Sequence, residues 1–363
     1  MPIYLDYNAT APIRPQVRAA MLHAMEEPAN PSSVHGYGRA AKKKVEDARA
    51  VIGEALSVFP HEVIFTATGT EANTLALKGL PDRDLIISSI EHASVIKTAG
   101  EPVKVIPVWP SGVIDLDALD EMLAKTQKPA LISVMLANNE TGVIQPIAEI
   151  AAKVHAHDGL LHTDAIQAVG KIPVDAGLLG ADMVSISAHK FGGPQGIAAL
   201  IVRQPLELQK LMVGGGQELG RRAGTENVAA ITGFATAIQL IAKDTWQKPI
   251  RDALDTMEQT MLAQVPGAQV LGKDSPRLPN TSSILMPKMK AETQLMHFDL
   301  AGFAISAGSA CSSGRIEPSH VAKAMKVSDE TADHVIRVSA GWNTNAEDIQ
   351  KFTDVWLKLA ASR

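Results

Sequence analysis

The chain has 363 residues and a net charge of -5, with 46% hydrophobic and 20% charged residues. This composition can bury a substantial core, and the acidic balance argues against nucleic acid as the main partner. No stretch approaches the roughly 18 consecutive apolar residues of a membrane span, so we expect no membrane partner.

Short apolar runs alternate with helical patterns through the first two thirds of the chain. Helix-like segments occupy residues 70–79, 115–126 and 146–157. The seven apolar runs cover residues 62–66, 84–89, 103–108, 130–136, 159–164, 182–187 and 196–202. This alternation is typical of an α/β fold with a doubly wound, mostly parallel sheet.

The pattern changes near residues 240–250, where long amphipathic helices take over and strands are few, as at 269–272 and 282–286. The change predicts a smaller α+β domain after the parallel sheet. We expect a large domain over residues 15–245, and a small domain formed by residues 1–14 and 246–363.

The first strand end that could form a binding site is "FTATGTEAN", where a helix begins at Gly69-Thr70. Backbone N–H groups and the helix dipole at such a start favour a phosphate. Thr70 and Asn73 could equally provide ordinary helix capping. The stretch matches neither a P-loop nor a dinucleotide fingerprint.

Two further strands end in polar groups. His92, in "SSIEHASV", is placed to stack on a flat cofactor and exchange protons near neutral pH, although a lone histidine is often structural. In "MLANNETG", Asn138, Asn139 and Glu140 follow the strand at 130–136. Because parallel strands end at one edge of a sheet, these groups should converge there.

Asp164 and Lys190 follow the next two strands, in "LLHTDAIQAVG" and "SISAHKFGG". A lysine that leaves a buried strand can be desolvated and act as a Schiff-base nucleophile. An aspartate beside it suits a pyridoxal phosphate ring, because its carboxylate keeps the pyridine nitrogen protonated. The alternatives are a helix-capping Asp164 and a surface Lys190.

Cys311 is the only cysteine of the chain and lies among small residues in "SAGSACSSG". One cysteine cannot form an internal disulfide or a four-thiolate metal site, so we expect no metal. A free thiol and the lack of a signal-peptide pattern at the N-terminus favour a cytoplasmic location. A flexible loop would suit a thiol that carries sulfur, although a chance surface thiol is the alternative.

Nine motifs, spread in order over residues 5 to about 345, together resemble the cysteine desulfurases, which are class V, fold-type I pyridoxal phosphate enzymes. They are "LDYNATAP", "NPSSVHGYG", "GTEAN", "EHASV", "NNETG", "TDAIQAVGK", "SAHKFGGP", "GGGQELGRRAGTEN" and "GSACSSG". The resemblance implies a large domain with a mostly parallel seven-stranded sheet, a smaller α+β C-terminal domain and a homodimer.

The resemblance also implies a pyridoxal phosphate site formed by Gly69, Thr70, His92, Asn139, Asp164, Gln167, Ser187, His189, Lys190 and Thr225. In it Lys190 would form the Schiff base, and His92 would stack on the ring. Asp164 would hold the pyridine nitrogen, and Gln167 would approach the phenolic oxygen. Thr225 would reach the phosphate of the neighbouring subunit.

For the reaction, the resemblance implies that L-cysteine is the substrate and that Asn139 and Arg337 hold its carboxylate. Lys190 would remove the Cα proton, and His92 would act as an acid or base. The Cys311 thiolate would then attack the substrate sulfur and become a persulfide, and alanine would leave. The persulfide would supply a sulfur-acceptor protein such as an iron–sulfur scaffold.

Three residues depart from the pattern common among cysteine desulfurases. Leu219 stands where a charged residue is frequent, Gln195 where lysine is frequent, and Trp342 where some relatives have arginine. Carboxylate binding therefore depends more heavily on Arg337.

Two other functions fit the same motifs. One is a selenocysteine lyase or another class V enzyme, and the other is a sulfur-transfer protein with little activity without its partner. The presence of Lys190, His92, Asp164 and Cys311 together favours an active desulfurase.

Overall fold

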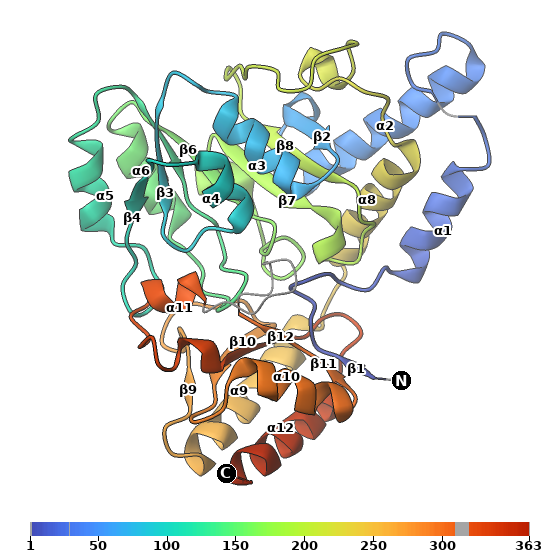
Figure 1. The fold of residues 1–363 in the computed structure, drawn as a ribbon. Helices are drawn as coiled ribbons and strands as arrows, with labels where there is room; N and C mark the ends of the chain where they lie inside the picture. Colours follow the sequence, from blue (N-terminus) through green and yellow to red (C-terminus); the bar gives the residue numbers. More distant parts are fainter. Residues whose placement is uncertain (1, 29, 309–318, 363) are drawn as a thin grey trace.

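A seven-stranded sheet forms the centre of the computed structural model, which describes residues 2–28, 30–308 and 319–362 (Figure 1). The strand order is β2-β8-β7-β6-β5-β3-β4. The strands are β2 (Val63–Thr66), β3 (Asp84–Ser88), β4 (Lys104–Ile106), β5 (Ala130–Ser133), β6 (Leu160–Asp164), β7 (Met183–Ser187) and β8 (Ala198–Val202). Each strand lies within one of the predicted runs. Strand β8 is antiparallel to β2 and β7, and the other pairs are parallel, so the predicted sheet is confirmed.

Both faces of this sheet are buried, which explains why its strands read as continuous apolar runs. Neighbouring residues such as Ile64 and Phe65 point to opposite faces and belong to different apolar clusters. Helices α3 (Gly69–Lys78) and α4 (Ala93–Ala99) cover one face. The helices on the other face are α1 (Pro15–Ala24), α2 (Gly36–Ala55), α5 (Leu116–Leu123), α6 (Ile147–His155), α7 (Ala176–Leu179) and α8 (Val228–Ile241).

The C-terminal part builds its own core on a four-stranded antiparallel sheet of order β12-β13-β10-β9. Its strands are β9 (Gln269–Val270), β10 (Thr281–Leu285), β12 (Ser306–Ala307) and β13 (Val335–Ser339). The helices around it are α9 (Gln247–Gln264), α10 (Ala291–Leu300), α11 (His320–Ala324) and α12 (Ala346–Ala361). Stacked Phe298 and Phe352 rings, 4.6 Å apart, lie in its core.

The first residues of the N-terminal segment pair with this C-terminal part, and the segment then crosses to the large domain, where the Ala11 N–H donates to the His189 carbonyl at 2.8 Å. Strand β1 (Ile3–Tyr4) pairs in parallel with β11 (Phe303–Ala304), and the buried Leu5 belongs to the C-terminal apolar core. The domain boundaries near residues 15 and 245 remain a prediction, which this pairing supports.

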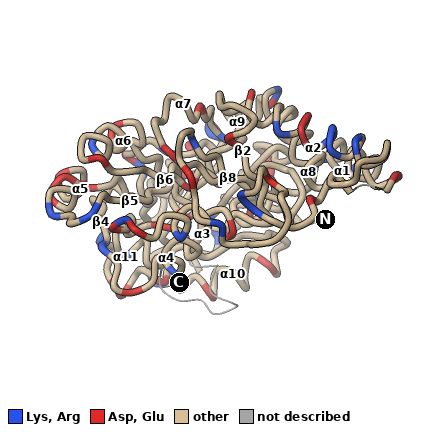
Figure 2. Tube along the Cα trace, turned by 90° about the horizontal axis from the view of Figure 1, so that it is seen from above, with Lys and Arg blue, Asp and Glu red and all other residues tan. Residues whose placement is uncertain are grey.

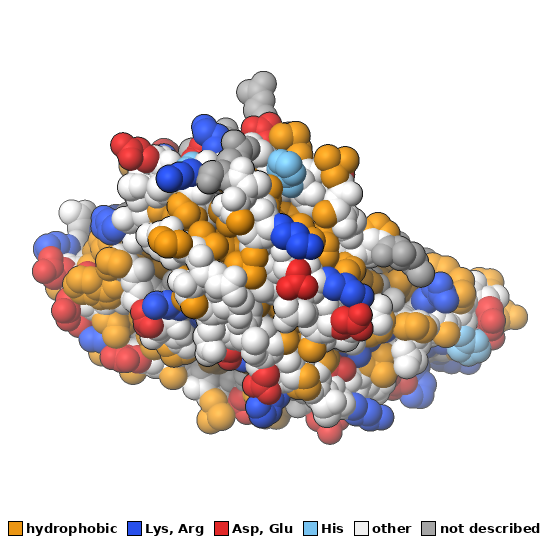
Figure 3. Space-filling model, turned by 90° about the horizontal axis from the view of Figure 1, so that it is seen from below, with side chains coloured by type: hydrophobic (Ala, Val, Ile, Leu, Met, Phe, Trp, Pro, Cys, Tyr) orange, Lys and Arg blue, Asp and Glu red, His pale blue; other side chains and the backbone are white. Residues whose placement is uncertain are grey.

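Lysine and arginine positions are interspersed with aspartate and glutamate positions along the outer helices in the view from above (Figure 2). The same mixture of charges covers the face seen from below, where hydrophobic side chains lie between them (Figure 3). Within the described ranges, no helix is long and apolar enough to cross a membrane.

Candidate active site

A cavity of 530 Å³ lies where the strands of the large sheet end. Residues that follow the ends of β2, β3, β5, β6 and β7 line it, together with Ala9 and Thr10 of the N-terminal segment. Nine residues proposed from the sequence line this one cavity: Gly69, Thr70, His92, Asn139, Asp164, Gln167, Ser187, His189 and Lys190. These nine residues converge at a single sheet edge as expected, whereas Asn138 and Glu140, which were expected there too, are buried and do not line the cavity.

The start of α3 forms one wall of the cavity. Thr68 caps this helix by accepting the N–H of Glu71 at 3.1 Å. Among the described residues, the N–H groups of Gly69 and Thr70 meet no hydrogen-bond acceptor. A Cβ at Gly69 would meet the terminal methyl group of Ile166, so a larger residue here would require the Ile166 side chain to move. The wall thus presents backbone donors of the kind that bind phosphate.

Asp164 is held from two sides at the end of β6. Its Oδ1 accepts the N–H of Ile166 at 3.0 Å, and its Oδ2 accepts Asn73 Nδ2 at 2.8 Å. Asn73 Nδ2 also donates to Ser94 Oγ at 2.9 Å. These bonds fix the carboxylate against the cavity, where Asp164 is nearly buried.

His92 caps α4 and faces the same cavity. Its Nδ1 accepts the backbone N–H of Ser94 at 3.1 Å, which assigns the proton of the neutral ring to Nε2. Burial lowers the pKa of His92, and the charges of Lys190 and His320 lower it further, against the opposing effect of Asp164. The ring is therefore mainly neutral at neutral pH, with a proton to donate from Nε2.

Lys190 lies in a short 3₁₀ turn directly after β7. Its Nζ donates to the carbonyls of Asn8 at 2.7 Å and Ala9 at 2.8 Å. The neighbouring His189 contacts Thr10 Oγ1 through Nδ1 at 3.1 Å. Burial, helped by the charges of Lys190 and Lys171, lowers the pKa of His189 to about 4, so this ring stays neutral.

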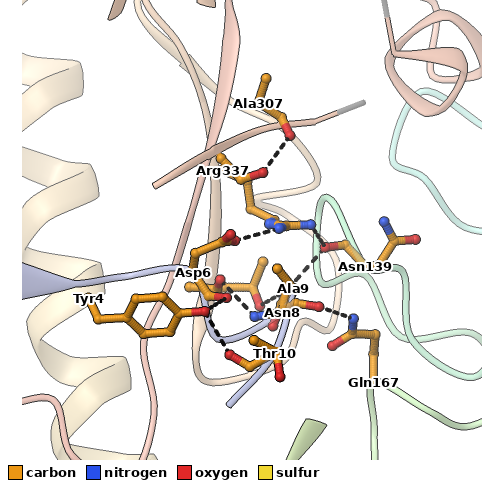
Figure 4. Close-up of polar contacts among 12 residues, drawn as sticks. Tyr4, Asp6, Asn8, Ala9, Thr10, Asn139, Gln167, Ala307 and Arg337 are labelled. Atoms are coloured by element: carbon orange, nitrogen blue, oxygen red, sulfur yellow. Dashed lines mark hydrogen bonds and ion pairs between the residues drawn. The ribbon is translucent and has the colours of Figure 1, made fainter. Parts of the chain in front are cut away.

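Arg337, the predicted substrate anchor, is buried on β13 and is absent from the residues that line the cavity. Its Nη2 donates to Asp6 Oδ1 at 2.6 Å, and its Nη1 donates to the carbonyl of Asn139 at 3.1 Å. Figure 4 shows the guanidinium between these two acceptors. A substrate carboxylate would have to compete with Asp6 for this arginine.

The family of this chain follows from comparison of its sequence with known proteins. The family model described as aminotransferase class-V matches residues 3–352. The chain belongs to the class V aminotransferase family. Within it, the chain is 39% identical to "Cysteine desulfurase IscS" of Dictyoglomus turgidum, over 97% of this chain and 93% of the relative. It is 41% identical to "Cysteine desulfurase" of Cereibacter sphaeroides, over 97% and 94%.

Solved structures agree with this class V assignment. A NifS-like protein from Rickettsia africae has a TM-score of 0.93 and 36% identity, and 100% of both chains is covered. The structure described as "SspA in complex with cysteine" has a TM-score of 0.81 and 32% identity, over 94% of this chain and 99% of that one. The fold predicted from the resemblance is confirmed.

Two residues proposed for this class V site do not line the main cavity: Thr225 lies elsewhere, and Cys311 is not among the described residues. Thr225 lines a separate cavity of 210 Å³, beside Arg222 and Glu218. Cys311 lies outside the described residues, so its role and the expected flexibility of its loop remain predictions.

The residues that depart from the family pattern take defined positions. Gln195 lines the main cavity. Trp342 Nε1 donates to the Pro12 carbonyl at 3.2 Å, and the Arg14 guanidinium lies 5.3 Å from its ring centre. Leu219 is exposed and has a φ of 57°, in the left-handed region.

Sequence reasoning missed several polar residues around the site. Asn8 accepts hydrogen bonds from Lys190 and Gln167, and Lys171 donates to both Asn8 and Gln167. Glu91, which precedes His92 in the chain, is fully buried. The signal for Glu91 was present, because it is a charged residue a few positions after an apolar strand. Asn8 lies in a segment whose position depends on contacts distant in the sequence.

Proposed function

We propose that this chain is a cysteine desulfurase that binds pyridoxal phosphate in the 530 Å³ cavity and converts L-cysteine to L-alanine. One observation carries the proposal: Lys190, which follows β7, and Asp164, at the end of β6, line the same cavity. The two relatives of about 40% identity support the substrate.

The donor set of the cavity fits pyridoxal phosphate. The backbone N–H groups of Gly69 and Thr70, with Ser187 and His189, would hold the phosphate. Asp164 would pair with the pyridine nitrogen. When bound, the cofactor supplies an electron sink for the charge that develops at the substrate Cα.

Three further residues complete the proposed cofactor site. His92 would stack on the ring, and Gln167, whose Nε2 faces the Asn8 carbonyl, would approach the phenolic oxygen. Thr225, exposed beside its own small cavity, would reach the phosphate of a second copy. We therefore propose a homodimer.

Lys190 and His92 would each carry out a different proton transfer of the reaction. The Lys190 amine, directed by two backbone carbonyls, would attach the cofactor and remove the proton from the substrate Cα. The His92 ring would exchange a proton near the sulfur, donating it from Nε2 as an acid and regaining it at that atom as a base. Asn139 and Arg337 would bind the substrate carboxylate, because a guanidinium matches its two oxygens.

The sulfur is proposed to leave as a persulfide on Cys311. In the net reaction, L-cysteine and the Cys311 thiol give L-alanine and a Cys311 persulfide, with no external oxidant or reductant. The thiolate attacks the substrate sulfur, the bond from that sulfur to Cβ breaks, and a proton replaces the sulfur on Cβ. A thiol with an ordinary pKa of about 8.5 needs some local stabilisation of its thiolate. A sulfur-acceptor protein, such as an iron–sulfur scaffold, would then receive the outer sulfur in the cytoplasm.

The test is a turnover assay of the purified yellow holoenzyme. L-Alanine should appear with L-cysteine, and sulfide release should require a reductant that cleaves the persulfide. Absence of alanine from cofactor-loaded protein would refute the desulfurase. Much faster turnover of selenocysteine would instead indicate a selenocysteine lyase, and alanine formed only with an added scaffold protein would indicate a partner-dependent enzyme.

A further inference from the structure

Lys171 is a buried amine that the proposed reaction does not use. It follows the turn after β6, and its side chain is almost inaccessible to solvent. Its Nζ donates to Asn8 Oδ1 at 2.7 Å and to Gln167 Oε1. No carboxylate of the described residues forms an ion pair with it. Burying a lysine without a counter-charge is costly.

Asn8 joins this amine to the Schiff-base lysine. Its backbone oxygen accepts Lys190 Nζ at 2.7 Å and Gln167 Nε2 at 2.8 Å. Its side-chain Oδ1 accepts Lys171 Nζ and, at 3.2 Å, Asn280 Nδ2. A single buried residue thus holds both amines, one through its main chain and one through its side chain.

The other end of the Asn8 side chain reaches the proposed substrate anchor. Its Nδ2 donates to the Asn139 carbonyl at 3.1 Å and to Thr281 Oγ1 at 2.9 Å. The same Asn139 carbonyl also accepts Arg337 Nη1. Figure 4 shows Gln167, Asn8, Asn139 and Arg337 connected in this way. A displacement of Asn8 would therefore change the contacts of both Lys190 and the Asn139 carbonyl.

We propose that Lys171 is a positioning residue that, through Asn8 and Gln167, fixes the Lys190 amine and opposes positive charge on it. This inference rests on the proposed function, because Lys190 matters as the group that attaches the cofactor.

The contact with Gln167 sets the orientation of its amide. An ammonium group only donates hydrogen bonds, so it selects the amide oxygen and turns the NH₂ group away from itself. One hydrogen of that NH₂ group goes to the Asn8 carbonyl. The second hydrogen is then available to an acceptor in the cavity, such as a phenolic oxygen.

The charges around the two amines determine the electrostatic effect. Burial lowers the pKa of Lys171 well below its usual value, and the positive charges of Lys190 and Arg337 add to this. Among the described residues, the groups that interact electrostatically with these amines include His92, His189 and Arg337, and the two amines also act on each other. Because like charges oppose each other, protons on Lys171 and on the Lys190 nitrogen disfavour each other, and the hydrogen bonds from Lys171 Nζ to Asn8 Oδ1 and Gln167 Oε1 favour the protonated form of Lys171 against the effect of burial.

The test is the pH dependence of the visible absorbance of the holoenzyme, which reports protonation at the nitrogen that joins Lys190 to the cofactor. Lys171→Met should raise the pH midpoint by about one unit, the size expected for removal of a nearby like charge. Asn8→Ala should raise it less, because it removes one acceptor of Lys171. The matched control Lys43→Met, which removes an exposed lysine of α2, should leave it unchanged.

A merely structural role for Lys171 predicts a lower melting temperature with an unchanged midpoint in folded, cofactor-loaded variants, and that result would overturn the inference. If Lys171→Met does not fold, Asn8→Ala decides alone by the same criterion. A wild-type protein without the chromophore would refute the proposed function instead. The comparison is then made on the pH dependence of Lys190 acylation by acetic anhydride, read by peptide mass spectrometry, where an equal midpoint in all variants refutes the inference.

Discussion

Glu91 is a buried carboxyl group near the active site, and its raised pKa should make the stability of the fold fall between pH 4.5 and pH 8. Its Oε1 accepts Ser88 Oγ at 2.9 Å and the N–H of Met135 at 2.7 Å. Its Oε2 has no hydrogen-bond donor among the described residues. Burial raises the pKa of Glu91 to about 8, and the negative charge of Asp164 contributes, against the effect of the two hydrogen bonds.

The Glu91→Gln substitution isolates this effect, because glutamine resembles the protonated acid and cannot ionise. Between pH 4.5 and 8, the unfolded chain loses the Glu91 proton while the folded chain keeps it. The wild-type free energy of unfolding should therefore fall by about 1.4 kcal/mol per pH unit from this group. Over the whole interval the loss approaches about 5 kcal/mol, and the variant should not show it.

The assay is urea unfolding of both proteins at pH 5 and pH 8. We expect similar midpoints at pH 5 and a clearly higher midpoint for Glu91→Gln at pH 8. An advantage of the variant that is the same at both pH values, or a loss of stability at pH 8, would refute the assignment of a neutral carboxyl. Activity should change little at pH 7, because Glu91 does not line the cavity.

Three further changes test other parts of the structure. Glu218→Ala leaves the buried Arg49 without the carboxylate 2.8 Å away, so urea unfolding should show a loss of about 3–5 kcal/mol, and a loss below about 1 kcal/mol would contradict a stabilising pair. Asp164→Asn should fold normally but lower kcat about 100-fold or more, and a change within tenfold would exclude an electrostatic role. Arg337→Lys should raise the KM for L-cysteine about tenfold, since lysine lacks the planar fork; an unchanged KM would place the carboxylate elsewhere.

The sequence predicted the large sheet and most of the cavity for one physical reason. A strand buried on both faces is mostly apolar, so a polar residue that follows it is conspicuous. His92, Asp164 and Lys190 were found in this way, and the common edge of parallel strands brought them together. Residues of this kind can be placed without knowledge of the tertiary contacts.

The support behind the site could not be predicted in the same way. Asn8 bonds Lys171, which is 163 residues away, and Asp6 bonds Arg337, which is 331 residues away. Both contacts depend on the N-terminal segment crossing between the two cores, which no local periodicity encodes. Thr225 lies outside the main cavity, which is compatible with the expectation that it reaches the phosphate of a second copy.

The most direct test of the account is the mass of the Cys311 peptide after the holoenzyme has reacted with L-cysteine without reductant. The account predicts that this peptide gains a single sulfur atom, that L-alanine forms in equal amount, and that Cys311→Ser forms no persulfide. Alanine formed with an unmodified Cys311 peptide would contradict the proposed sulfur transfer.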